Sequence, residues 1–290
     1  VMIKASAGGG GKGMRAVYRE EELEGAISSA RAEAKAAFAD NRIYIEKLIS
    51  NAKHIEFQIL ADQYGKVVHL GERDCSAQIR NQKVMEESPC PSISKELRKA
   101  MGDVAAESAK AAGYVNAGTV EFLLDSQNNY YFMEMNTRIQ VEHPITEMVT
   151  GIDIVKEQIR IAAGEKLSFG QEDIKIKGHA IECRINAENP DRNFMPCPGT
   201  IENVLFPGGF GIRIDTAIYP GYTVPSSYDS MLAKVIAYGT DRNEALKKMK
   251  SALSEFIIDG IDSNIDFQYE LLQRPEIKSG DYHTGVLKCE

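Results

Sequence analysis

The stretch that decides the fold reads Glu134-Met135-Asn136-Thr137-Arg138-Ile139-Gln140-Val141-Glu142. Successive side chains of a β-strand point to opposite faces of the sheet. If 130–142 is one strand, one face carries only polar groups, at Glu134, Asn136, Arg138, Gln140 and Glu142. The other face carries Met135, Thr137, Ile139 and Val141, and we expect it to pack into the core. A solvated face is the alternative, but it would favour Lys, Thr and Ser, so the pattern indicates a functional surface.

The preceding strand, predicted at 117–124, adds a second carboxylate. If the hairpin is symmetric about the loop 125–129, Glu121 faces Glu134 and Thr119 faces Asn136. Side chains paired in this way lie about 5 Å apart at Cβ, so two carboxylates there repel each other unless a cation lies between them. Two carboxylates and an amide, without His or Cys nearby, suit Mg²⁺ or Mn²⁺ better than Zn²⁺.

A glycine-rich loop at 7–13 follows an apolar strand that ends at Lys4. Consecutive glycines let backbone N–H groups approach phosphate oxygens. The loop is not a Walker A motif, because Gly13 follows Lys12 where Ser or Thr is required. A flexible linker is the alternative, yet a buried lysine beside the loop needs an anion, and a nucleotide phosphate would serve. Glu46 and Lys47 end another strand, where an adenine could bind.

Composition limits the classes of function. The chain has 290 residues and a formal net charge of −8, which argues against a nucleic-acid-binding protein. No apolar run approaches the roughly 18 residues needed to span a bilayer, and no signal peptide is visible. Five scattered cysteines without metal-ligand spacing indicate free thiols and a cytoplasmic location.

Periodicity predicts an α+β protein. Helices are expected at about 20–38, 94–113, 146–163, 242–256 and 265–272. Strands are expected at 1–4, 42–48, 55–60, 67–71, 117–124, 130–142, 178–185, 200–204, 211–215 and 233–238. Residues 72–93 are polar and contain prolines, so they are predicted to form an irregular active-site loop. The chain starts within a strand and without Met, so we expect it to be truncated at its N-terminus.

These motifs together resemble biotin carboxylase, a member of the ATP-grasp superfamily. The likeness covers essentially the whole chain and rests on 4–13, 72–76, 81–83, 134–144, 183–188 and 228–231. It implies a partial ATP-grasp lid subdomain at 1–48 and an antiparallel-sheet body with the metal and bicarbonate site at 49–176. A biotin carboxylase C-terminal domain would follow at 177–290. Asn81 departs from the pattern, since many relatives have His there.

The resemblance also implies a role for individual residues. ATP would be bound by Lys4, Gly10, Gly11, Glu46, Lys47, Ile49, His54 and Gln78. Mg²⁺ or Mn²⁺ would be bound by Glu121, Glu134 and Asn136, and bicarbonate by Lys83, Arg138, Gln140, Val141 and Glu142. Glu142 would be the general base, Arg138 would stabilise the biotin enolate, and Arg184 would contact biotin.

The implied activity is ATP-dependent carboxylation of biotin on a biotin carboxyl carrier protein, the first half-reaction of acetyl-CoA carboxylase in fatty acid synthesis. Carboxyltransferase subunits would be further partners, and a homodimer would use Phe210 and Arg213. Alternatives are the corresponding domain of pyruvate or another acyl-CoA carboxylase, another ATP-grasp ligase for a carboxylate or amino acid, or a non-catalytic assembly domain. Because the family's N-terminal domain is missing, we expect this fragment alone to have weak or no activity.

Overall fold

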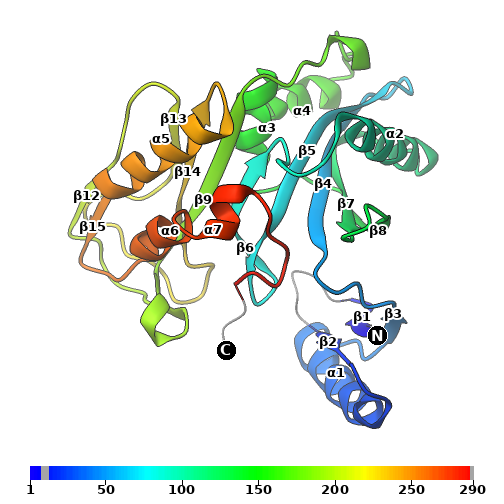
Figure 1. The fold of residues 1–290 in the computed structure, drawn as a ribbon. Helices are drawn as coiled ribbons and strands as arrows, with labels where there is room; N and C mark the ends of the chain where they lie inside the picture. Colours follow the sequence, from blue (N-terminus) through cyan, green and yellow to red (C-terminus); the bar gives the residue numbers. More distant parts are fainter. Residues whose placement is uncertain (8–12, 288–290) are drawn as a thin grey trace.

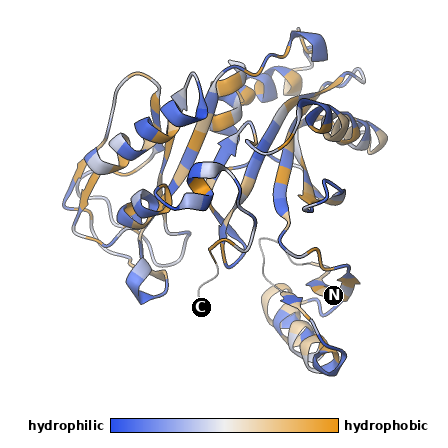
Figure 2. Ribbon diagram, viewed as in Figure 1, coloured by the Kyte–Doolittle hydropathy of each residue, from blue (hydrophilic) through white to orange (hydrophobic). Residues whose placement is uncertain are grey.

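An eight-stranded sheet forms the centre of the computed structural model, which describes residues 1–7 and 13–287 (Figure 1). Its strand order is β13-β14-β9-β6-β5-β4-β7-β8, and all seven neighbouring pairs are antiparallel. The strands are β4 Lys53–Ala61, β5 Val67–Ile79, β6 Gln82–Ser88, β7 Asn116–Leu124, β8 Tyr130–Asn136, β9 His179–Asn186, β13 Ile212–Thr216 and β14 Met231–Gly239. Hydrophobic and hydrophilic residues are mixed along these strands (Figure 2), as expected for a sheet that holds polar groups in its interior.

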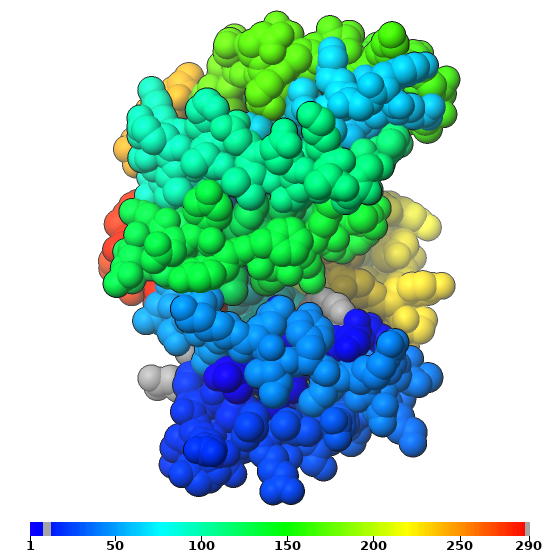
Figure 3. Space-filling model, turned by 90° about the vertical axis from the view of Figure 1, so that its right-hand side faces the viewer, coloured from blue at the N-terminus to red at the C-terminus, as the bar shows by residue number. Residues whose placement is uncertain are grey.

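A small N-terminal unit lies apart from this sheet and forms the blue lower end of the molecule in Figure 3. It contains β1 Met2–Ala5, β2 Met14–Ala16 and β3 Ile43–Glu46, in the order β2-β1-β3. The 3₁₀ turn η1 Glu20–Glu22 leads into α1 Leu23–Phe38, which packs on this sheet through Leu23, Ile27 and Ala30. The helix expected at about 20–38 and the strands expected at 1–4 and 42–48 are therefore confirmed, whereas β2 was not expected.

Helices cover the large sheet. The first, α2 Lys95–Ala111, starts where expected, because Ser94 Oγ accepts a hydrogen bond from the Leu97 N–H at 3.1 Å. The expected helix 146–163 is wrong in one respect: it is two helices, α3 His143–Thr150 and α4 Ile154–Ala162. Gly151 interrupts them with a φ of +73°, and Asp153 caps the second. The remaining helices are α5 Arg242–Glu255, α6 Ile265–Leu271 and α7 Pro275–Ser279.

Shorter elements complete the C-terminal half of the chain. The pairs β10 Glu188–Asn189 with β11 Met195–Pro196, and β12 Asn203–Leu205 with β15 Ile257–Asp259, form two small antiparallel sheets. Two 3₁₀ turns are η2 Gln171–Asp173 and η3 Pro190–Arg192. None of the described helices combines the length and apolar character needed to cross a membrane.

The expectation of an irregular loop at 72–93 is wrong. Residues of β5 and β6 form a buried hairpin there, and Glu72, Arg73 and Asp74 are all inaccessible to solvent. Each charge has a partner; Glu72, for example, accepts a hydrogen bond from Arg98 at 2.7 Å. Apolar alternation is the usual sign of a strand, and a strand whose buried polar side chains pair with charges on neighbouring elements lacks that sign.

The predicted hairpin of 117–124 and 130–142 is partly confirmed. The expected register is present, since Glu121 pairs with Glu134 and Thr119 with Asn136. The second strand is shorter than expected, because β8 ends at Asn136 and 137–142 is irregular. Strict alternation therefore stops at Asn136, and Thr137 is exposed rather than in the core.

The predicted subdomain limits remain a prediction. The large sheet is continuous across residue 176, because β9 pairs with β6 through Met85–Cys183 and Glu86–Glu182. The C-terminal part of the chain is thus joined to the sheet that carries the polar hairpin.

A buried carboxylate, Glu87, ties the C-terminal segment to this sheet. Its oxygens accept hydrogen bonds from His179 at 2.6 Å, from Arg242 at 2.7 Å and from the Tyr282 hydroxyl at 2.7 Å. Burial opposes the ionised form, but His179 and Arg242 lower the pKa of Glu87 to about 2 from its usual 4.5. Its contribution to stability is therefore present above pH 4.5 and lost as pH falls toward 2.

We predict that Glu87→Gln lowers the free energy of unfolding by about 3 kcal/mol at pH 7, because it leaves Arg242 buried without a full counter-charge. Urea unfolding of the purified protein measures this. The difference between variant and wild type should shrink as the pH is lowered from 5 to 3. Glu107→Gln, at an exposed helix position, serves as the control and should leave the urea midpoint nearly unchanged. A Glu87→Gln protein as stable as wild type would contradict this role.

Candidate active site

A fully buried guanidinium, that of Arg73 on β5, organises the polar interior of the large sheet. Its Nε donates to Glu56 Oε1 at 2.6 Å, and one terminal nitrogen donates to Gln58 Oε1 at 2.8 Å and Thr146 Oγ1 at 3.0 Å. The other terminal nitrogen reaches Thr119 Oγ1 and Gln140 Oε1, both at 3.3 Å. One side chain thereby links β4, β7, α3 and the irregular segment 137–142.

Next to this guanidinium, Lys83 on β6 lies among three carboxylates. Its Nζ is 2.6 Å from Glu56 Oε2, 2.6 Å from Glu142 Oε1 and 3.4 Å from Glu121 Oε1. Burial alone would lower the pKa of Lys83, but Cys75 and the three carboxylates raise it well above its usual value. The ammonium group therefore stays charged and can bind an anion.

Glu142 lies directly before α3 and is 2 % exposed. Burial opposes its ionisation, but Lys83, Arg184 and Arg73 together lower its pKa below the usual range. Arg184, on β9, reaches it with a terminal nitrogen 3.0 Å from Oε2, while its Nε donates to Glu86 Oε1 at 2.7 Å. The carboxylate is thus ionised at neutral pH and held between two cations.

The oxygen-rich end of the site lies on the β7–β8 hairpin. Glu121 accepts hydrogen bonds from Asn136 Nδ2 and Gln140 Nε2, both at 2.9 Å, and lies opposite the exposed Glu134. Burial works against its charge, yet His54 and Lys83 lower the pKa of Glu121 well below its usual value. Two opposed carboxylates and an amide on one strand pair fit a hard divalent cation such as Mg²⁺ or Mn²⁺.

A second group of possible metal ligands overlaps this hairpin. Single ligand atoms of His54, Glu56 and Glu121 lie within 4.8 Å of one another. The Lys83 ammonium already pairs with both of these carboxylates, so a further cation among the three would meet a buried positive charge. The hairpin of Glu121 and Glu134 is therefore the better place for a divalent cation.

The residues predicted to bind ATP fall in two places. His54 and Gln78 join the site: the His54 ring lies 3.0 Å from Glu121 Oε2 and 2.9 Å from Gln78 Nε2. Lys4 and Glu46 belong to the N-terminal unit, where they form an ion pair of 2.6 Å, so the anion beside Lys4 is that carboxylate. Lys47 is exposed, with its Nζ 5.2 Å from the centre of the Tyr131 ring, and Ile49 is half-buried. Gly10 and Gly11 lie outside the described residues.

The other predicted residues line the irregular segment. Gln140 is buried against Arg73. Arg138 is exposed; its guanidinium donates to Ile139 O at 3.2 Å and lies 3.4 Å from Asn136 Oδ1. The Val141 carbonyl accepts a hydrogen bond from Lys234 of β14 at 2.8 Å. Gln140 donates to the hairpin carboxylate Glu121, and Glu142 joins the site through Lys83 and Arg184. The path of this irregular segment, rather than strand alternation, places both side chains.

Four residues of this network were missed by sequence reasoning: Glu56, Gln58, Glu86 and Lys234. A signal existed for the first two, because Glu56 and Gln58 alternate with Ile55, Phe57 and Ile59 along β4. That is the pattern that singled out Glu134 and Asn136. The other two reach the site only through the pairing of β6, β9 and β14.

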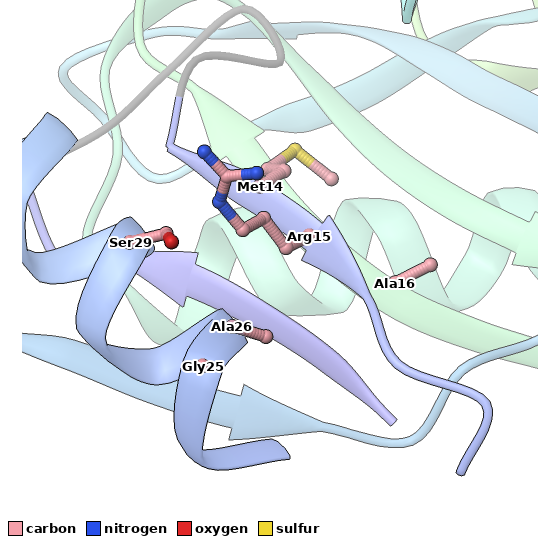
Figure 4. A pocket seen from close by; sticks show the side chains of 6 residues that line it. All are labelled: Met14, Arg15, Ala16, Gly25, Ala26 and Ser29. Atoms are coloured by element: carbon pink, nitrogen blue, oxygen red, sulfur yellow. The ribbon is translucent and has the colours of Figure 1, made fainter. Parts of the chain in front are cut away.

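A shallow pocket lies elsewhere, between β2 and α1 of the N-terminal unit (Figure 4). Its side chains are short apart from Met14 and Arg15, and the rest of the lining is Ala16, Gly25, Ala26 and Ser29. Arg15 is already paired with Glu33 at 3.1 Å. None of the predicted site residues lines this pocket.

Comparison with known proteins identifies the family. The family described as "Carbamoyl-phosphate synthase L chain, ATP binding domain" matches residues 1–169, and "Biotin carboxylase C-terminal domain" matches 182–289. The chain belongs to the biotin carboxylase family. Its fold is the ATP-grasp fold of that family, as the resemblance in the sequence predicted.

Similar proteins carry more than one name. Biotin carboxylase 1 of Bacillus subtilis is 57% identical over 289 residues, which cover 99% of this chain and 64% of that protein. A pyruvate carboxylase subunit of Methanothermobacter thermautotrophicus is 55% identical, over 98% of this chain and 58% of its own length. The chain therefore spans less than two thirds of these relatives.

A solved structure of a related protein has the same fold. It is the biotin carboxylase domain dimer of Hydrogenobacter thermophilus 2-oxoglutarate carboxylase, in complex with MgADP, ADP and bicarbonate. The two folds superpose with a TM-score of 0.97 at 49% identity, over 99% of this chain and 63% of that one.

We predict that Glu56→Gln lowers the free energy of unfolding by about 3 kcal/mol, since both Arg73 and Lys83 lose a buried counter-charge. Urea unfolding followed by circular dichroism measures the change. Glu165→Gln, at an exposed position, is the matched control and should differ from wild type by less than about 0.5 kcal/mol. Equal stability of the two variants would show that Glu56 does not hold the two cations together.

Proposed function

We propose that the protein containing this chain carboxylates biotin with ATP and bicarbonate. The observation that carries this proposal is the placement of Glu142 between Lys83 and Arg184, with the divalent-cation ligands of the β7–β8 hairpin beside it. A carboxylate base flanked by two cations suits a small anionic substrate that must lose a proton. ATP would come from the side of the N-terminal unit and His54.

Bicarbonate would bind to Lys83, Arg138, Gln140, Glu142 and the backbone of Val141. It would then attack the γ-phosphate of ATP to form carboxyphosphate, with Glu142 accepting the proton of bicarbonate. Bicarbonate would compete with Glu142 for the charges of Lys83 and Arg184, which would raise the pKa of Glu142 and make it a stronger base. Lys83 and Arg138 would stabilise the negative charge that gathers in the transition state.

Carboxyphosphate would release CO₂ and phosphate, and the freed phosphate would take the N1′ proton of biotin. The N1′ of the resulting enolate would then attack the CO₂ and form carboxybiotin. Arg138, exposed at the mouth of the site, would stabilise the biotin enolate, and Arg184 would contact biotin. Glu121, Glu134 and Asn136 would hold Mg²⁺ or Mn²⁺, which would neutralise phosphate charge during transfer. Lys4, Glu46, Lys47, Ile49, His54 and Gln78, with Gly10 and Gly11, would hold ATP.

The molecule that finally receives the carboxyl group from biotin is a separate question. We propose acetyl-CoA, with a biotin carboxyl carrier protein and carboxyltransferase subunits as partners. Pyruvate or another acyl-CoA or keto acid is the second candidate, favoured by the likeness to the Methanothermobacter pyruvate carboxylase protein and to 2-oxoglutarate carboxylase. A non-catalytic assembly role is disfavoured, because the charged groups of the site are present and mutually paired.

We also infer a homodimer, in line with the dimer named for the similar 2-oxoglutarate carboxylase domain. Phe210 is 90% exposed, which suits an interface position. Arg213 is paired with Glu147 at 2.6 Å and Asp215 at 2.7 Å. Its side chain would therefore already be held in one conformation before an interface forms. The free thiols Cys75, Cys90, Cys183 and Cys197 support a cytoplasmic location.

We predict that the full-length protein releases ADP from ATP in a reaction that needs Mg²⁺, bicarbonate and free biotin. A coupled assay for ADP, with each component left out in turn, measures this. ADP release that is the same with and without biotin would overturn the proposed function. Acetyl-CoA or pyruvate, supplied with the carrier and transferase proteins, would then separate the two candidate acceptors.

We predict that Glu142→Gln reduces bicarbonate-dependent turnover at least 100-fold while ATP binding stays within about threefold of wild type, because the base is lost and its partners, Lys83 and Arg184, are not assigned to ATP. Steady-state kinetics and nucleotide titration measure the two effects. Glu165→Gln should match wild type in both. Turnover retained by Glu142→Gln would exclude Glu142 as the base.

A further inference from the structure

Two buried carboxyl groups lie behind the site and have no role in the chemistry above. Glu86 on β6 and Glu182 on β9 are direct partners in the antiparallel pairing, and both are inaccessible to solvent. Among the described residues, neither oxygen of Glu182 has a hydrogen-bond partner, and one oxygen of Glu86 has none. Unsatisfied buried polar atoms are rare, so this pair calls for a physical explanation.

The two carboxyls differ in their contacts. Glu86 Oε1 accepts a hydrogen bond from Arg184 Nε at 2.7 Å, and a terminal nitrogen of the same guanidinium contacts it as well. Arg184 uses that terminal nitrogen to reach Glu142 Oε2 at 3.0 Å. Glu86 therefore binds Nε and one terminal nitrogen of the guanidinium, and Glu142 binds the same terminal nitrogen.

Glu182 has no such partner among the described residues. Ile236 of β14 is its neighbour on the other side, and Ile236 packs with Ile145 and Val149 of α3 and with Ala180. The charged groups around it are Glu86 from β6, Lys234 from β14, Arg184 from its own strand and Glu142 at the start of α3. Both cations are already committed, since Lys234 donates to the Val141 carbonyl and Arg184 to Glu86 and Glu142.

We propose that Glu86 is a positioning residue that aims Arg184 at Glu142, and that Glu182 behind it is a neutral carboxylic acid. Two ionised carboxylates directly opposite each other in a dry interior repel strongly. A proton on Glu182 removes that repulsion, and Glu86 is then the one carboxylate of this pair that carries a negative charge beside Arg184. The inference rests on the proposed function, because Arg184 is the residue assigned to biotin.

The ionisation behaviour agrees with this division. Burial raises the pKa of Glu182 well above its usual value, and the charge of Glu86 raises it further. Burial raises the pKa of Glu86 to about 7, and Arg184 acts in the opposite direction. Lys234 and Arg184 oppose the rise for Glu182 as well, so the two carboxyls differ in their hydrogen bonds: Arg184 donates to Glu86 and, among the described residues, nothing donates to Glu182.

The same substitution at the two positions tests the proposal in the full-length protein. Glu86→Gln should raise the KM for free biotin about tenfold, because the Arg184 guanidinium loses the charged partner that fixes its orientation. The KM for ATP should stay within about twofold. Glu182→Gln should leave both constants within about twofold of wild type, because it replaces a neutral group by a neutral group of the same shape.

A separate measurement concerns stability against pH. A group whose folded pKa is raised contributes stability that is complete below its unfolded pKa and is lost as pH rises through the folded pKa. Glu182→Gln has no ionisable group at this position and does not lose stability in this way. Its urea midpoint should therefore rise relative to wild type as pH increases from 5 to 9. A difference that stays constant over that range would show that Glu182 is ionised in the fold.

The outcomes are distinct from a failure of the proposed function. If wild type shows no biotin-dependent turnover, the proposed function fails. If wild type is active and Glu86→Gln keeps its KM for biotin, or loses ATP and biotin affinity equally, the positioning role fails. If Glu86→Gln does not fold, Glu86→Asp takes its place. It keeps the charge but moves the carboxylate away from Arg184, so it should raise the KM for biotin by a smaller factor. An unchanged KM would overturn the proposal.

Discussion

The buried guanidinium of Arg73 is the interaction on which the rest of the structure depends. A charge without access to water is tolerated only when every donor finds an acceptor. Arg73 meets this condition by binding side chains from two strands, a helix and the segment 137–142. The position of that segment, and with it Gln140 and Glu142, is therefore set by a need for hydrogen bonds as well as by the packing of Ile139 against the core.

Charge alternates through the site as a consequence. Glu56 lies between Arg73 and Lys83, and Glu142 lies between Lys83 and Arg184. Lys83 and Arg184 are each shared by carboxylates, so neither is neutralised by a single fixed partner. An incoming anion can then compete for these two cations without leaving one carboxylate entirely unpaired. An acidic protein can in this way offer buried cations to an anion.

Sequence pattern was a reliable guide where side chains alternate and unreliable where they do not. The register of Glu121 with Glu134 followed from symmetry about a short loop, and the structure has it. The strand at 72–79 was mistaken for a loop, because its polar residues are buried by pairing with side chains of other elements, as Glu72 does with Arg98 and Arg73 with Glu56. The end of β8 at Asn136 was missed for a related reason: the polar residues beyond it reach the site through a turn into α3, not through the sheet.

The sequence by itself determined the family, the α+β class and the residues that carry charge, because motifs and local periodicity are written along the chain. Only the tertiary structure decided which charges meet. Glu56, Glu86 and Lys234 lie far from 134–142 in sequence, and strand pairing across the sheet places them around Lys83, Arg184 and Val141. A buried charge is defined by its partners in space, and those partners come from strand order, which no local pattern encodes.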